Sequence, residues 1–125
     1  MGYKNKLQKT ERRNKQHDFT LSHEDRISYN YARTSTTNEI IEVVNVSFEV
    51  LIKGKWHTII RYDSHHGYLH KHVLLTLSDE KSIAEPVNIS GTHSDWLTWA
   101  INDLIEHFME YKKTFFENNS IIDNN

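Results

Sequence analysis

The clearest alternation of hydrophobic and polar positions lies between residues 40 and 77. In the segment IIEVVNVSFEVLI, apolar side chains alternate with polar ones from Val44 onward, which is typical of a half-buried strand. Two further segments, WHTIIRYD and YLHKHVLLTL, follow after short polar turns that each contain a glycine. The pattern therefore predicts an antiparallel meander with strands at 40–52, 56–63 and 68–77.

A different pattern follows the only proline, Pro86. Apolar residues recur every three or four positions, which predicts one long amphipathic helix over 94–117 whose start Thr92 or Ser94 can cap. Its apolar stripe comprises Leu97, Ala100, Ile101, Leu104, Ile105, Phe108, Tyr111 and Phe115. The segment PVNI before it can add a fourth strand. We therefore expect an α+β fold, with a three- or four-stranded antiparallel meander and one long C-terminal helix packed on one face.

The 125 residues fit one domain, and the polar ends suggest that the folded part is smaller than the chain. We expect a basic, partly disordered N-terminal arm over 1–38, an α+β domain over 39–117 and a frayed tail over 118–125. No run approaches the roughly 18 apolar residues that cross a bilayer, and the N-terminus lacks the apolar centre of a signal peptide. The chain has no Cys, so disulfides and Cys-ligated zinc are excluded. These features predict a soluble, cytoplasmic protein.

The charge is distributed unevenly. Residues 1–16 carry six Lys or Arg side chains and one acidic side chain, a net of +5, so the rest of the chain carries −7 to give the total of −2. A basic segment on an acidic body suits a contact with nucleic acid or an acidic partner, or it is simply a solvated tail. Tyr3 is its only aromatic residue, so the segment by itself does not indicate a stacking platform for single strands.

The strand register decides which side chains share a surface. If KGK forms a three-residue loop, Ile52 pairs with Trp56 and Phe48 with Ile60; if SHHG forms a four-residue turn, Arg61 pairs with His70. Since paired residues share a face, one face becomes the core, with Lys71 as its one misfit. The predicted core face contains Val44, Val46, Phe48, Val50, Ile52, Trp56, Thr58, Ile60, Tyr62, Leu69, Val73, Leu75 and Leu77. The opposite face contains Glu49, His57, Arg61, Asp63, His70 and His72, with His65 and His66 at its rim.

Three interpretations of this histidine-rich face compete. Imidazoles exchange protons near neutral pH and a guanidinium holds phosphate, so Arg61, Asp63, His70 and His72 suit metal-independent RNA cleavage. The same histidines with Asp63 can instead ligate a metal such as Zn²⁺, although Arg61 repels a cation and the spacing is no specific zinc signature. In the third interpretation, the face is an ordinary exposed polar surface, which a protein partner can cover without any catalysis.

The string Arg61-Tyr62-Asp63, followed by His66-Gly67 and His70-Lys71-His72, resembles a family of small prokaryotic proteins with an R-Y-D-x-x-H-G-x-x-H core. It also resembles the TumE-type toxins of toxin–antitoxin pairs, from which the chain departs at Ser64 and in the length of the turn. This resemblance implies a ribonuclease-like toxin with RNA as substrate and a cognate antitoxin protein as partner. It implies the same working set of Arg61, Asp63, His70 and His72. From their place on the open face or at its rim, we predict His65, His66, Glu49 and His57 as binding residues. We expect neither a cofactor nor a resident metal.

Overall fold

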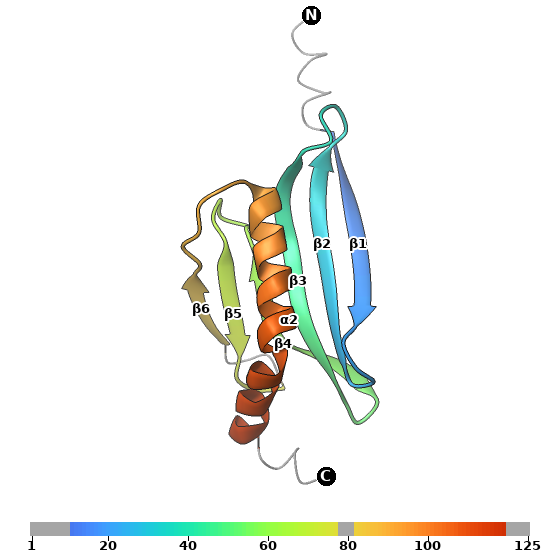
Figure 1. Cartoon of the computed structure of the whole chain (residues 1–125), viewed down its shortest axis with the longest axis vertical. Helices are drawn as coiled ribbons and strands as arrows, with labels where there is room; N and C mark the ends of the chain where they lie inside the picture. The colour runs from blue at the N-terminus through green and yellow to red at the C-terminus, as the bar shows by residue number, and fades with distance from the viewer. Residues whose placement is uncertain (1–10, 78–81, 120–125) are drawn as a thin grey trace, which may run out of the picture.

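A computed structural model describes residues 11–77 and 82–119, which form a six-stranded antiparallel sheet with one long helix on one face (Figure 1). The strands are β1 (Arg12–Thr20), β2 (Asp25–Thr34), β3 (Ile40–Ile52), β4 (Lys55–Asp63), β5 (His70–Leu74) and β6 (Ser82–Pro86), and the helix is α2 (His93–Asn118). Strand order follows the chain. The predicted α+β meander with a long C-terminal helix is therefore confirmed, with six strands rather than three or four.

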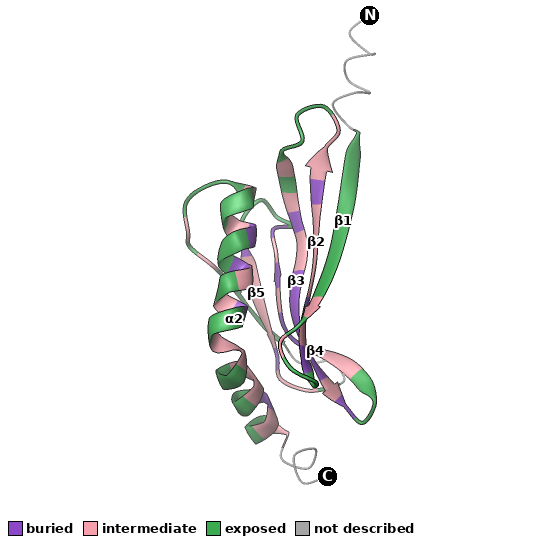
Figure 2. Ribbon diagram, turned by 45° about the vertical axis from the view of Figure 1, so that its right-hand side comes forward, coloured by how far each residue is buried: buried purple, intermediate pink, exposed green. Residues whose placement is uncertain are grey.

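The two additional strands at the start of the sheet come from the segment that was expected to be a partly disordered arm. β1 is regularly paired with β2, and β2 with β3, so the sheet begins near residue 12 and not near residue 39. Figure 2 shows why β1 was hard to foresee: it is exposed along almost its whole length, so burial imposes no hydrophobic alternation on it. The expected behaviour of residues 1–10 and of the tail beyond residue 119 lies outside the described residues.

The β3–β4 hairpin turns through two residues, not three. Lys53 and Gly54 both have positive φ angles, 51° and 82°, as a tight hairpin turn requires. The register at this end is therefore one residue away from the predicted one, with Leu51 opposite Trp56. A β-bulge at Ile59 restores the predicted pairing of Phe48 with Ile60 further along.

This turn corrects the placement of three side chains, those of Trp56, His57 and Thr58. Trp56 was expected in the core, but it lies on the face away from the helix, where the guanidinium carbon of Arg26 is 4.2 Å from the centre of its ring. His57 was expected on the open face, but it pairs with Val50 and so shares the face of the core. Thr58 was expected on the core face, but it pairs with Glu49 and so lies on the open face. All three residues precede the bulge, where a one-residue change of register reverses every side chain.

A second irregularity lies in β3. Asn30 pairs with Asn45 and Tyr31 with Val43, so Val44 is the extra residue of a bulge. Val43 consequently occupies the core position that was predicted for Val44. This bulge turns Val44 toward the opposite face, where it lines a pocket described below.

The core lies between the sheet and α2, which contacts β2, β3 and β4. Phe48 and Ile60 are buried there as predicted, and Thr92 caps the helix in a capping box with Asp95. Of the predicted stripe, Leu97, Ala100, Leu104 and Phe115 are buried, whereas Ile105 is exposed. Figure 1 shows α2 lying over the middle of the sheet, with β1 and β2 extending to one side.

A polar network connects the sheet to the helix inside this core. The phenol of Tyr62 on β4 and that of Tyr111 on α2 both donate to Oδ2 of Asp103, the latter at 2.6 Å. Lys71 on β5 donates to the Tyr111 phenol oxygen at 2.7 Å. Lys71 therefore belongs on the core face, because its ammonium group has a polar partner there. Burial, reinforced by hydrogen bonding to the Asp103 carboxylate, raises the pKa of both phenols above the ordinary value.

An ion pair holds the other side of the helix to the sheet. The Lys112 ammonium lies 3.1 Å from Oδ1 of Asp25, a carboxylate that is almost fully buried at the start of β2. Ser22 donates to the second carboxylate oxygen at 2.5 Å. Breaking a buried ion pair leaves an uncompensated charge, which is costly, so this pair fixes α2 over β2 and β3.

We expect Phe48→Ala to lower the free energy of unfolding by about 3–5 kcal/mol, because it removes a fully buried ring that packs against Phe108. Urea titration measures the change. Ile83→Ala, at an exposed position on β6, is the control and should change stability by less than about 0.5 kcal/mol. Equal effects of the two substitutions would contradict the assigned core.

We expect stability to fall as the pH rises above the ordinary tyrosine pKa of about 10. A phenol whose folded pKa is raised keeps its proton at a pH where the unfolded chain has lost it. Deprotonation therefore stabilises the unfolded state relative to the folded state at alkaline pH. The decline should be less steep in Tyr62→Phe, which lacks one of the two phenols. Denaturant titrations across this pH range compare the slopes, and identical slopes would contradict the role of Tyr62.

Candidate functional site

The turn between β4 and β5 is anchored to β3 by one buried side chain, Ser64. The Ser64 amide donates to the carbonyl of Val43 at 2.9 Å, and the Val43 amide donates to the Ser64 hydroxyl at 2.9 Å. The Gly67 amide then closes the turn onto the Ser64 carbonyl at 2.9 Å, with a Gly67 φ of 89° that favours glycine. These bonds fix the position of the chain immediately after Asp63.

β4 and β5 pair so that the histidines come alongside Arg61 and Asp63. Arg61 lies opposite His72 and Asp63 opposite His70, because six residues rather than four separate the two strands. The predicted partner of Arg61 was His70, so the register differs by two residues. A shift of two preserves the face, and all four predicted residues therefore share the surface opposite α2.

Asp63 is the centre of this group. Its Oδ2 lies 3.0 Å from Nε2 of His72, an ion pair when the imidazole is protonated, and its Oδ1 lies 3.9 Å from Nδ1 of His70. The His65 amide donates to Oδ1 at 3.2 Å. The carboxylate is mostly buried, so these partners hold it in place between the two rings.

His70 is enclosed by other rings. Its side chain is 12% exposed, and Nδ1 is buried without a hydrogen-bond partner among the described residues. Tyr68 lies against it at 4.1 Å between ring centres, and His66 and His72 follow at 5.5 and 6.1 Å. A buried ring nitrogen without a partner costs free energy, which makes this atom a point where a ligand group gains a hydrogen bond.

Arg61 completes the wall of a pocket of about 450 Å³. The residues that line it are Glu42, Val44, Arg61, Asp63, His65, His66, His70, His72 and Ala84. Within residues 11–77 and 82–119, no ion pair engages the Arg61 guanidinium. A guanidinium without a carboxylate partner can bind an anion bidentately.

Comparison with known proteins then places the chain in a family. The model of one family, the domain of unknown function DUF7718, matches residues 8–121. The chain belongs to this family. No curated protein and no solved structure matches it. The DUF7718 match includes β1 and β2, in agreement with a domain that begins well before residue 39. The DUF7718 description names no activity, so the likeness to TumE-type toxins stays a hypothesis.

Two of the predicted binding residues lie apart from the pocket of this DUF7718 chain. Glu49 forms an ion pair with Arg26 at 2.6 Å, further along the open face, and His57 is on the face of the core. His65 and His66 do line the pocket, as predicted for the rim. Arg26 contacts both Glu49 and the ring of Trp56, so Glu49 belongs to this cluster near the β3–β4 turn.

Sequence reasoning missed Glu42, Ser64 and Tyr68. Glu42 lies 3.9 Å from Nδ1 of His65 and also pairs with Arg12 on β1 at 2.8 Å. The bulge at Val44 shifts the pairing of the earlier part of β3 by one residue. Glu42 therefore points to the face that carries the pocket. No feature of the sequence marks that bulge, whereas Ser64 stood out as a departure from the TumE-type pattern.

Across the described ranges, 11–77 and 82–119, no three His, Asp or Glu side chains are grouped so that they could hold a metal ion. In the same ranges, no helix is long and apolar enough to span a membrane.

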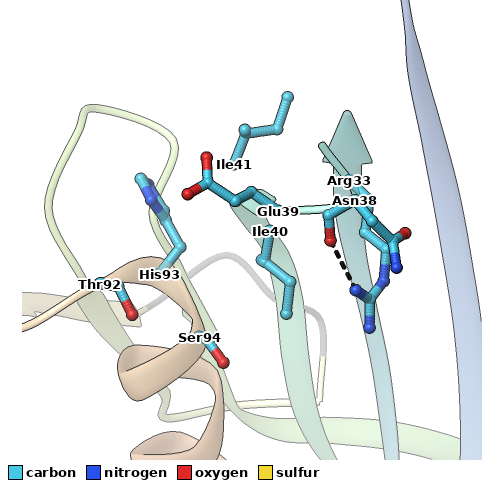
Figure 3. Close-up of a pocket in the computed structure, with 8 residues that line it drawn as sticks. All are labelled: Arg33, Asn38, Glu39, Ile40, Ile41, Thr92, His93 and Ser94. Carbon is cyan, nitrogen blue, oxygen red and sulfur yellow. Dashed lines mark hydrogen bonds between the residues drawn. The ribbon is translucent and has the colours of Figure 1, made fainter. Parts of the chain in front are cut away.

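A second pocket, of about 620 Å³, lies beside the start of α2. Figure 3 shows it between the start of α2, with Thr92, His93 and Ser94, and the turn from β2 to β3. Arg33 donates to the Asn38 carbonyl at 2.8 Å at its edge. No residue that lines the pocket around Asp63 also lines this second pocket.

We expect Ser64→Ala to lower the free energy of unfolding by about 1–3 kcal/mol, because it leaves the buried Val43 amide without an acceptor. Chemical denaturation measures this. Ser94→Ala, at an exposed position in the first turn of α2, is the matched control and should have little effect. If both substitutions cost the same, Ser64 does not anchor the turn.

Proposed function

We propose that this protein is a metal-independent endoribonuclease whose active site is the pocket around Asp63. The observation that carries the proposal is the position of Asp63, with His72 at 3.0 Å and His70 at 3.9 Å, in a pocket also lined by Arg61. Two imidazoles, a carboxylate and a guanidinium without an ion-pair partner are the groups that such a reaction needs.

In the proposed reaction, His72 is the general base. It takes the proton of the ribose 2′-hydroxyl, and Asp63 stabilises the positive charge that then forms on the ring. The 2′-oxygen attacks the adjacent phosphorus, and the bond to the 5′-oxygen breaks. His70 gives its proton to that leaving oxygen, which yields a 2′,3′-cyclic phosphate and a free 5′-hydroxyl.

Arg61 binds the phosphate through the reaction. Negative charge grows on the non-bridging oxygens as the phosphorus becomes five-coordinate, and a fixed guanidinium stabilises this charge more than the ground state. His70 and His72 lie 6.1 Å apart between ring centres, so a phosphate bound across the outer edges of the two rings contacts both. His66 lies at the rim beside His70 and contacts the flanking nucleotide.

The resemblance to TumE-type toxins adds a biological setting to this proposal. A ribonuclease of this kind arrests growth when it is expressed, and a cognate antitoxin protein relieves the arrest by covering the pocket. Induced expression of the wild-type chain and of His72→Ala tests this setting separately from the chemistry.

We expect His72→Ala and His70→Ala each to lower the rate of RNA cleavage by roughly 10²–10⁴-fold, since each removes one proton transfer. Arg61→Gln should also abolish most activity while the melting temperature stays the same. The assay uses an end-labelled RNA with a chelator present. A substrate with a 2′-deoxy sugar at the scissile position should remain intact.

His107→Ala is the control, because this histidine lies on α2, among its acidic residues and away from the pocket. RNA that stays intact between about pH 5 and 8, with and without divalent metal, would reject the proposal. Cleavage that is undiminished in His72→Ala would contradict the assigned role of His72 as the general base. In a non-catalytic interaction module, the same substitutions would weaken a protein complex and leave RNA unaffected.

A further inference from the structure

The part of the sheet formed by β1 and β2 presents a second surface, on the side that faces α2. Pairing places Arg13 opposite Arg33, Lys15 opposite Tyr31 and His17 opposite Tyr29. Paired residues share a face, and Tyr29 also pairs with Val46 of the core, so this face is the one toward the helix. We call the six residues Arg13, Lys15, His17, Tyr29, Tyr31 and Arg33 the aromatic–basic strip.

The rings of the strip lie nearly parallel. The ring centres of Tyr29 and Tyr31 are 6.2 Å apart with 13° between their planes, and His17 lies 5.0 Å from Tyr29 with 25° between planes. His17 is exposed, and the two tyrosines are half-buried. Figures 1 and 2 show that α2 does not cover β1, so one side of the strip is open to solvent.

The cations of the strip have no acidic partner among the described residues. Arg13 and Arg33 donate only to the side chain and the carbonyl of Asn38, at 3.4 and 2.8 Å, and the Arg33 guanidinium carbon is 5.2 Å from the centre of the Tyr31 ring. On the opposite face of β1, by contrast, Arg12 is neutralised by Glu42. The charge of β1 is therefore divided between two faces, and the unpaired cations lie with the aromatic rings.

This combination identifies the chemistry of a ligand. Nearly parallel aromatic rings on a sheet stack with nucleobases, and unpaired Arg and Lys side chains beside them bind the phosphates that link those bases. The body of the protein is acidic, so a cationic strip is not a general feature of its surface. The pocket in Figure 3 extends the strip beyond Arg33, with Glu39 as the acidic side chain in its lining.

We propose that the aromatic–basic strip binds single-stranded nucleic acid, as a site separate from the pocket around Asp63. Bases stack against the outer surface of the ring group formed by Tyr31, Tyr29 and His17, while Lys15, Arg13 and Arg33 contact the backbone. The strip lies on the other face of the sheet from Asp63, so this binding does not depend on the proposed cleavage.

The test measures binding of a short fluorescent 2′-O-methyl RNA, which cannot be cleaved through its 2′-oxygen, by anisotropy. We expect Tyr31→Leu to raise the Kd roughly 5- to 100-fold, the loss of one stacked base, and Tyr31→Phe to leave it nearly unchanged. Lys15→Gln should lower the slope of log Kd against log salt by about 0.7. Lys55→Gln, at an exposed position beside the β3–β4 turn, is the matched control for charge.

Further arms separate the outcomes. A single-stranded DNA of the same sequence tests whether sugar type matters, and binding of either strand supports the proposal, whereas a preference for the duplex overturns it. His72→Ala should bind as tightly as the wild type, since the two sites are separate. Equal Kd values for Tyr31→Leu and the wild type, with unchanged melting temperature, would overturn the proposal, as would a Lys15→Gln slope equal to that of Lys55→Gln. Failure to bind any single strand at low salt would do the same and would leave the strip to a protein partner.

Discussion

The arrangement of this molecule depends on one buried residue of β4, Tyr62, whose phenol is bonded to Asp103 of the helix. Side chains alternate across a strand, so the residues on either side of Tyr62 must point away from the helix. Those neighbours are Arg61 and Asp63. The bond that attaches β4 to α2 therefore also orients the two charged residues of the candidate site, although it lies on the opposite face of the sheet.

The same constraint explains why the site is built from adjacent strands. β5 follows β4 through a turn that Ser64 fastens to β3, and this places His70 and His72 beside Asp63 and Arg61. The hydrophobic core and the polar site thus share the strands that carry them. Side chains on one face supply the burial energy, and the other face is free to hold groups that would be costly in a core.

Three register shifts occur among the described strands, and two of them affect the site. The bulge at Ile59 compensates for the tight turn at Lys53 and Gly54. Beyond it, β3 and β4 pair in the predicted register, with Arg61 opposite Ser47. The bulge in β3 puts Val43 into the core and lets Glu42 and Val44 reach the pocket. Each bulge adds one residue to one strand and so exchanges the two faces beyond it.

The sequence by itself determined the α+β class, the helix over most of its length and the face that holds Arg61, Asp63, His70 and His72, because a two-residue alternation and a 3.6-residue period are local signals of burial. It did not determine the turn lengths, the bulges or the places of Trp56 and His57, because these depend on which residues pair across strands. It also left β1 unrecognised. The aromatic–basic strip arises only when Lys15 and His17 pair with Tyr31 and Tyr29, more than ten residues further along the chain, and a contact between distant segments leaves no pattern within either of them.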